Sequence, residues 1–356
     1  MFRPAIFRTA LALCCAVALW AMAVNRVILN YPTSPQKTLA TFLLAGLLAA
    51  VALYPSWSVP QRRSLVWPWL ALAVLLGVGE LRRLWLRNDY RVESPRAASL
   101  FTPVTTTELR VTRFTLRVAG LPVERVRFAH LTDLHATEAQ PQSYRERVMD
   151  ELRALDPDVI VLTGDYVSTA RRLPLLADWL KGLPRARYGS FGVLGNHDHW
   201  TGQAARVSET LEHAGVRVLN AECRAVPLDA AHSLALCGTD APWGPAPDPE
   251  QVKAAKGRAL ATFVLSHTPD NVYDFADLGV DGVFAGHTHG GQIRVPGLGA
   301  LIIPSRYGRR FDQGRFLLDR TQLFVSAGIG ADAPPLRLWC PPEILVVELL
   351  PAERSG

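Results

Sequence analysis

The sequence has little lysine, so most of its positive charge comes from arginine. Only Lys37, Lys181, Lys253 and Lys256 occur among 356 residues, so arginine supplies nearly all the positive charge behind a formal net charge of +6. Arginine suits phosphate and anionic lipid recognition, although an arginine-rich genome would give the same bias. The basic residues form no compact run, so we expect no nucleic-acid partner.

Cysteine is also scarce, with five in the whole chain. Cys14 and Cys15 lie in a hydrophobic run, and Cys223, Cys237 and Cys340 are scattered singly. Because no CxxC pair occurs, we expect neither a disulfide framework nor a zinc site built on cysteine.

Charged residues are missing from three apolar runs near the N-terminus, at residues 9–24, 39–53 and 65–79. Each run is near the short end of the range that spans a bilayer, about 17–25 residues, and apolar flanking residues can extend it. The pattern predicts a transmembrane region of about three helices over residues 1–88. The alternative is that some runs are buried helices of a soluble domain.

The distribution of basic residues predicts how these spans are oriented. With three spans, seven basic residues fall on the side of the large C-terminal part and four on the other side. This bias favours the cytoplasm for the C-terminal part. The first run also resembles a signal peptide, with Arg3 and Arg8 before it and Ala21-Met22-Ala23 at its end, and its cleavage would reverse the orientation.

The chain turns polar after residue 88, which predicts a linker over 89–106 and a folded domain over 107–352. Residue patterns predict strands at 110–118, 125–132, 158–163, 191–194, 233–237, 262–266, 282–285, 323–326 and 344–349. They predict helices at 143–155, 173–183 and 203–213. Strands that alternate with helices indicate a layered α/β domain, with antiparallel pairs toward the end. The proline-rich segment 240–249 is expected to be a loop, either a lid or a connector.

Asp, His and Asn residues follow five of the expected strands, at the points where the strands end. All nine histidines lie at or after position 130, and five of them occupy such positions. The segments are Asp133-Leu134-His135, Gly164-Asp165, Gly195-Asn196-His197-Asp198, His267 and Gly286-His287-Thr288-His289. Open α/β sheets form their sites at the carboxyl ends of strands, so we expect these side chains to meet. A chance scatter of polar loop residues is the alternative.

These side chains have the chemistry of a metal site. Carboxylates, imidazoles and an amide oxygen, without a thiolate, suit Mn, Fe, Zn or a similar divalent ion. The set exceeds what one ion needs and fits two ions that share a carboxylate. Two such ions can clamp a phosphoryl group and activate a water. The chain has no Cys-x5-Arg stretch, so nothing indicates a covalent phosphoenzyme.

The five segments, in this order, resemble the signature of the calcineurin-like metallophosphoesterases, and the resemblance covers roughly residues 107–352. It implies a four-layer β-sandwich flanked by helices. The stretch GHTHGGQ, together with Gly328-Ile329-Gly330 and Pro342-Glu343-Ile344, resembles a bacterial membrane-associated or exported branch. That branch includes phosphodiesterase-like proteins and some UDP-2,3-diacylglucosamine pyrophosphatases.

The resemblance also implies a role for each candidate residue. One ion would be held by Asp133, His135 and His289. The second would be held by Asn196, His267 and His287, and Asp165 would bridge both. His197 would contact the phosphate and protonate the leaving oxygen, with Asp198 orienting its ring. Manganese is the first choice of metal, with Fe, Zn, Ni and Mg as alternatives.

The expected function is a phosphoesterase of the bacterial inner (cell) membrane that hydrolyses a phosphodiester or pyrophosphate by metal-activated water. The hydrophobic runs favour a lipid-linked substrate, such as a phospholipid or a nucleotide-diphospho-lipid. One alternative is a protein Ser/Thr phosphatase. Another is a catalytically silent membrane receptor or scaffold, although the complete set of candidate residues argues against it.

Overall fold

The computed structural model describes residues 74, 90–93, 103–296, 299–300, 302–332 and 335–352. The chain divides into two units, residues 1–88 with 301–310, and residues 89–300 with 311–356. Apart from Val74, the three hydrophobic runs lie outside the described residues. Within the described part of the chain, no helix is long and apolar enough to cross a membrane. The transmembrane region therefore stays a prediction.

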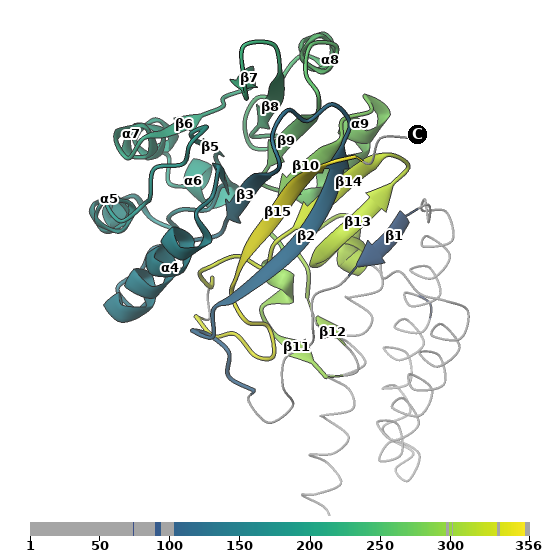
Figure 1. Ribbon diagram of the computed structural model, residues 1–356. Coiled ribbons are helices and arrows are strands. Elements are labelled where there is room, and N and C mark those ends of the chain that lie inside the picture. The colour runs from purple at the N-terminus through teal and green to yellow at the C-terminus, as the bar shows by residue number, and fades with distance from the viewer. Residues whose placement is uncertain are drawn as a thin grey trace, which may run out of the picture. The chain divides into compact units, whose positions relative to one another are not determined.

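Two mixed β-sheets form the centre of the second unit (Figure 1). The six-stranded sheet has the order β2-β15-β3-β4-β5-β6. Its strands are β2 (Arg110–Val118), β3 (Val126–Leu131), β4 (Val159–Thr163), β5 (Ser190–Val193), β6 (Val216–Val218) and β15 (Glu343–Pro351). Within it, β3, β4, β5 and β6 run parallel to one another.

The seven-stranded sheet has the order β1-β13-β14-β10-β9-β8-β7. Its strands are β1 (Tyr90–Glu93), β7 (Cys223–Pro227), β8 (Ser233–Thr239), β9 (Thr262–Ser266), β10 (Gly282–Ala285), β13 (Gly314–Leu318) and β14 (Thr321–Val325). The four central strands β8, β9, β10 and β14 are parallel, and the outer pairs are antiparallel. A separate small ribbon joins β11 (Arg294–Val295) to β12 (Gly299–Ala300).

Phenylalanines from both sheets build the core between them. The ring of Phe128 on β3 stacks on that of Phe284 on β10, with ring centroids 5.6 Å apart. Phe284 also contacts Phe263 on β9 and Phe324 on β14, and all four side chains are fully buried. Strands that are covered on both faces read as continuous apolar runs, which explains why β4 and β9 could be recognised from the sequence.

Three helices cover the outer face of the six-stranded sheet: α4 (Gln142–Leu155), α5 (Leu173–Leu180) and α7 (Ala204–His213) (Figure 1). Their apolar stripes, including Val148, Leu176 and Leu211, pack in one core with Ile160 and Leu162 of β4. The remaining helices are α6 (Asn196–Trp200), α8 (Pro249–Lys256) and α9 (Val272–Asp277). Short 3-10 turns are η2 (Ala170–Arg172), η3 (Pro269–Asn271), η4 (His289–Gly291) and η5 (Gly308–Phe311).

The predicted α/β layering with antiparallel pairs toward the end is confirmed, and β2, β9 and β10 have the predicted bounds. Edge strand β1 lies in the segment expected to be a linker. It was not predicted, nor were β6, β7 and β13. These strands are short or lie near the sheet edges, so burial leaves only a weak pattern in their sequences.

The expectation that the cysteines form no disulfide is wrong for one pair. Cys223 on β7 and Cys237 on β8 face each other across the antiparallel pair and are joined by a disulfide. Their pairing depends on the register of two strands, which single cysteines in a sequence do not reveal. Cys340 is free and buried.

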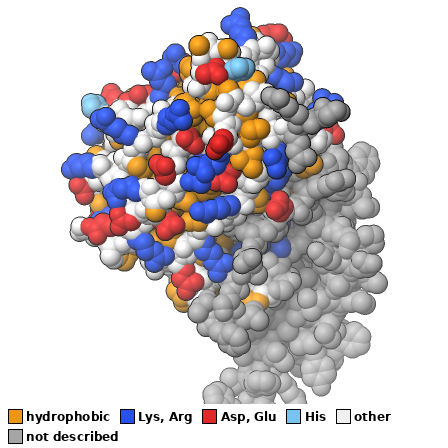
Figure 2. Space-filling view, in the orientation of Figure 1, with side chains coloured by type: hydrophobic (Ala, Val, Ile, Leu, Met, Phe, Trp, Pro, Cys, Tyr) orange, Lys and Arg blue, Asp and Glu red, His pale blue; other side chains and the backbone are white. Residues whose placement is uncertain are grey.

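On the face shown in Figure 2, basic and acidic side chains of the described residues are interspersed, and no large area carries one sign. Apolar side chains lie between them. That nucleic acid is not a partner stays a prediction.

Candidate metal centre and active site

The loops that follow parallel strands of both sheets converge at one place. β3, β4 and β5 deliver Asp133, Asp165 and Asn196 from the six-stranded sheet, while β9 and β10 deliver His267 and His287 from the seven-stranded sheet. Parallel neighbours end at the same edge of a sheet. The packing of the two sheets then brings both edges together, so all seven predicted metal ligands lie in one site.

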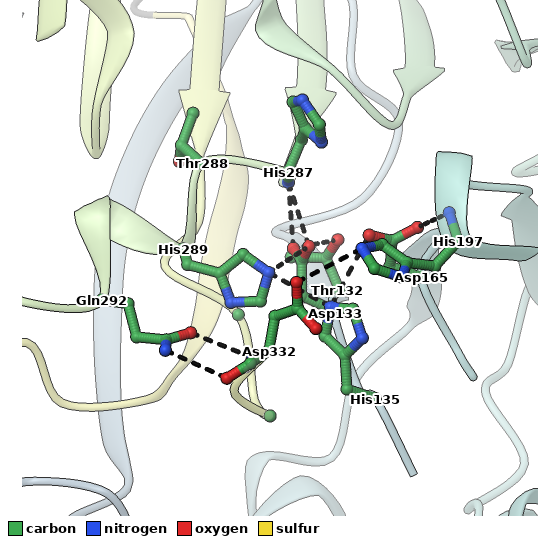
Figure 3. Close-up of polar contacts among 12 residues, drawn as sticks. Thr132, Asp133, His135, Asp165, His197, His287, Thr288, His289, Gln292 and Asp332 are labelled. Carbon is green, nitrogen blue, oxygen red and sulfur yellow. Dashed lines mark hydrogen bonds and ion pairs between the residues drawn. The ribbon is translucent and has the colours of Figure 1, made fainter. Parts of the chain in front are cut away.

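Two overlapping clusters share the carboxylate of Asp165, and Figure 3 shows this residue together with the others of the first cluster. The first contains Asp133, His135, Asp165 and His289, and the second contains Asp165, His267 and His287; within each, the potential ligand atoms lie within 4.8 Å of one another. Asp165 Oδ2 lies 3.6 Å from His135 Nε2 and 3.3 Å from His267 Nε2.

Asn196 joins the second cluster through its amide oxygen, which lies 3.1 Å from His267 Nε2. The residues predicted to hold each ion thus lie near one another, with Asp165 between the two groups. Which residue holds which ion stays a prediction.

The backbone is strained at five of the seven predicted ligands. The φ angles of Asp133, His135, Asp165, His287 and His289 are 52°, 40°, 55°, 66° and 51°. Left-handed backbone costs a non-glycine residue about 1–3 kcal/mol and persists where the surrounding structure enforces it, often at functional sites. Here it lets residues two or four positions past a strand turn their side chains into the shared site.

Two glycines are required by the close approach of these loops. A Cβ atom at Gly195 would overlap the carboxylate of Asp165. One at Gly286 would overlap the hydroxyl of Thr132 and the carboxylate of Asp133. The loops are therefore so close that only glycine fits.

The electrostatics of the site indicate that it is built for added positive charge. Among the described residues, the ion-pair partners of Asp133 and Asp165 are histidines. Burial and the nearby charge of Asp165 raise the pKa of Asp133 to about 7, although His267 acts against them. Burial would also raise the pKa of Asp165, but His267 and His135 hold it well below its ordinary value.

The histidines are shifted in both directions. Burial lowers the pKa of His267, but Asp165 and Asp133 outweigh it and raise the value to about 9. Burial lowers the pKa of His135 to about 4. Carboxylates and imidazoles without a lysine or arginine partner form a donor set that fits divalent metal ions, whose charge would compensate the buried acids.

His197 lies at the edge of this centre. Its backbone N–H donates to Asp165 Oδ1 at 2.8 Å, and its ring meets that of His135 edge-on. Its side chain is 19% exposed, and its Nε2 lies 3.5 Å from Asp332 Oδ2. Burial lowers the pKa of His197, but Asp332 and Asp165 more than offset it, so the pKa is raised above its ordinary value. The raised pKa favours the protonated form of this imidazole at the edge of the centre.

Asp198 does not orient the ring of His197 as predicted. Its Oδ2 accepts the backbone N–H groups of Asp165 and Gly195, and its Oδ1 accepts those of Tyr166 and Val167. Both oxygens are thus committed to the backbone. Asp198 instead fastens the loop that carries Asp165 to the loop that carries Asn196.

The loop over residues 240–249 does more than connect two elements, because it packs against the second cluster. The ring of Trp243 lies 5.1 Å from that of His287 and 5.8 Å from that of His267. Asp240 anchors this loop: its Oδ1 accepts the N–H of Leu194, and its Oδ2 lies 3.3 Å from His199 Nε2. Asp240 directly follows β8, so its position after a strand was a usable signal. Asp332 had no such signal.

Comparison with known proteins agrees with this geometry. A family model described as calcineurin-like phosphoesterase matches residues 126–291. The phosphodiesterase YaeI of Escherichia coli (strain K12) is 30% identical over 224 residues, which are 62% of this chain and 80% of that protein. The chain belongs to the calcineurin-like phosphoesterases. It is therefore a hydrolase of phosphoric esters, in a family whose members include phosphodiesterases and pyrophosphatases.

Two further relatives of this phosphoesterase match a similar share of the chain. The UDP-2,3-diacylglucosamine pyrophosphatase LpxG of Chlamydia muridarum is 24% identical over 280 residues, covering 63% of this chain and 84% of that protein. An uncharacterized metallophosphoesterase of Campylobacter jejuni is 30% identical over 225 residues, 62% of this chain. The match spans 58% of the length of the Campylobacter protein.

Substitutions in the phosphoesterase should separate metal binding from proton donation. Asp165→Asn should lose metal and activity together, because both clusters share its carboxylate. His197→Ala should keep the metal and lose about 10²–10⁴-fold in kcat, the usual contribution of a general acid. Elemental analysis and steady-state rates measure the two effects, with exposed Asp178→Asn as the control. Metal loss in His197→Ala would identify His197 as a ligand.

Metal affinity should rise with pH. The raised pKa values of Asp133, about 7, and His267, about 9, mean that the metal-free site holds protons at neutral pH. Bound metal must displace these protons, so affinity should be weak below pH 7 and level off above pH 9. Calorimetric titration with Mn²⁺ in two buffers of different ionisation enthalpy measures the released protons. Binding that releases no proton at pH 7 would contradict these pKa shifts.

Proposed function

We propose that this chain is a membrane-anchored phosphoesterase that uses two divalent ions, with manganese the first choice, to hydrolyse a phosphodiester or pyrophosphate. The observation that carries the proposal is the place of Asp165 in both ligand clusters, with His197 fastened to the same carboxylate. Two bound ions would stabilise the phosphoryl oxygens and lower the pKa of a water.

His197 supplies what the ions do not. When the bond from phosphorus to the leaving oxygen breaks, that oxygen needs a proton unless it is already a good leaving group. Burial lowers the pKa of His197, but Asp332 and Asp165 raise it overall, which favours the protonated ring. Its partial exposure leaves the ring accessible to a substrate. The hydrogen bond from its backbone N–H to Asp165 fixes its distance from the centre.

A lipid-linked substrate fits this proposal. The three hydrophobic runs support a membrane location, and the name of the relative LpxG describes a pyrophosphatase of an acylated nucleotide sugar. Trp200, the last residue of α6, is 65% exposed, and its ring centroid is 5.0 Å from that of His197. An exposed aromatic ring beside the proton donor provides apolar contact for the leaving group.

The substrate proposal is tested on the full chain in detergent micelles with Mn²⁺. We expect hydrolysis of bis-p-nitrophenyl phosphate, arrest by a chelator and recovery on added metal. UDP-2,3-diacylglucosamine and a phospholipid, assayed in parallel, identify the natural class, with Asp165→Asn as the matched inactive control. Protein that binds two ions and turns over no phosphoester would support the scaffold alternative, and preference for a phosphopeptide would support the protein phosphatase.

We also propose that the catalytic domain lies in an oxidising compartment outside the cytoplasm. Disulfides persist in oxidising compartments and are rare in the cytosol, so the Cys223–Cys237 bond supports this side of the membrane. The bias of basic residues predicts the cytoplasm instead. We give the disulfide more weight because it belongs to the catalytic domain itself, whereas the bias reverses if the first run is cleaved.

C-terminal reporter fusions in the intact cell measure the orientation. Fused alkaline phosphatase, which is active only after export, should be active, and fused green fluorescent protein should be dark. Thiol labelling of the denatured chain should reach Cys223 and Cys237 only after reduction, with Cys340 labelled in both conditions as the internal control. A fluorescent fusion, together with labelling of Cys223 and Cys237 without reduction, would show that the domain lies in the cytoplasm and would contradict this proposal.

A further inference from the structure

Asp332 brings a carboxylate to the candidate active site from a segment that the signature motifs do not include. It follows β14, beyond Gly328-Ile329-Gly330, and its Oδ2 faces Nε2 of His197 at 3.5 Å (Figure 3). Potential ligand atoms of Asp332, His135 and His197 lie within 4.8 Å of one another. The carboxylate is thus beside both the proton donor and the first ligand cluster.

The position of Asp332 is fixed by its backbone. The side chain of Gln292, the last residue of GHTHGGQ, accepts the N–H of Asp332 at 3.0 Å and donates to its carbonyl at 3.1 Å. On the other side, Gly330 donates to the carbonyl of Asp133 at 2.7 Å, and buried Arg337 donates to the carbonyl of Gly330. The segment is therefore tied to the metal-ligand loops at two points.

The side chain of Asp332 is nonetheless open to a substrate. It is 43% exposed, whereas the side chains of Asp133 and Asp165 are almost fully buried. A negative charge in this position acts on whatever phosphoryl group contacts His197.

We propose that Asp332 is a specificity-determining residue that makes the site select singly charged phosphoryl groups, those of phosphodiesters and pyrophosphate diesters, over the doubly charged group of a phosphomonoester. A diester presents one negative charge to the site, and His197 together with the metal ions can balance it. A monoester brings a second charge close to the carboxylate of Asp332, and the repulsion weakens its binding. This inference rests on the proposed function and specifies its substrate class.

Gln292 has a defined part in this selection. It holds the backbone of Asp332, so it keeps the carboxylate at the site. The role accounts for the final residue of GHTHGGQ, which is not among the seven predicted metal ligands.

The test compares kcat/KM for p-nitrophenyl phosphate and bis-p-nitrophenyl phosphate in the full chain, with Asp332→Asn against Asp319→Asn. Asp319 is an exposed acid in the turn between β13 and β14, so it matches the change in charge away from the site. Asp332→Asn should raise the monoester-to-diester ratio on the order of tenfold, the effect of one charge at several ångströms in a partly solvated site. Added salt should reduce this difference, and Gln292→Ala should shift the ratio in the same direction.

Other outcomes overturn the proposal. An equal fall for both substrates would make Asp332 a residue that only positions His197, and loss of bound metal would make it a ligand. An unchanged ratio would show that its charge does not reach the substrate. If the wild-type chain hydrolyses no phosphoester, the proposed function fails by itself. Calorimetric affinities for inorganic phosphate and dimethyl phosphate then test the charge selection, which Asp332→Asn should shift toward phosphate.

Discussion

The carboxylate of Asp165 is the point on which the rest of the site depends. Its Oδ1 accepts the N–H of His197, and its Oδ2 faces ring nitrogens of His135 and His267. Its own N–H donates to Asp198, and its carbonyl accepts the N–H of His135. His267 comes from one sheet and the other partners from the second sheet, so this residue links the two halves of the sandwich where their strands end.

The buried side chain of Arg337 connects two loops of the site. Arg337 is fully buried and donates to backbone carbonyls of Gly330, His289, Ala327 and Gly328. Burying a charge is costly unless it is compensated by hydrogen bonds, and here the carbonyls of two loops provide them. The same bonds place the metal-ligand candidate His289 and the segment that carries Asp332, so metal binding and substrate selection share one support.

The sequence predicted those parts of this centre that depend on local residue patterns. Continuous apolar runs such as β9 and β10 mark strands buried on both faces, and the polar residues directly after them had to meet at one edge. What the sequence did not reveal depends on register and tertiary packing. The Cys223–Cys237 pair requires the alignment of β7 with β8, and the wall formed by Trp243 requires the path of a proline-rich loop. Asp198 was assigned to its neighbour His197, but its position in space directs it to four backbone amides instead.

Two features of the site destabilise the metal-free fold, and bound metal ions would offset both. Left-handed backbone at five predicted ligands and the repulsion between the buried carboxylates of Asp133 and Asp165 each raise the free energy of the metal-free fold. A ligand that binds only the folded chain lowers that free energy in proportion to its affinity and concentration. Divalent ions bound between Asp133 and Asp165 would remove the repulsion between them and use the directions that the strained backbone imposes. The geometry that makes the metal-free loops costly would thus be the geometry that binds the ions tightly, and catalysis and folding would respond to the same ions.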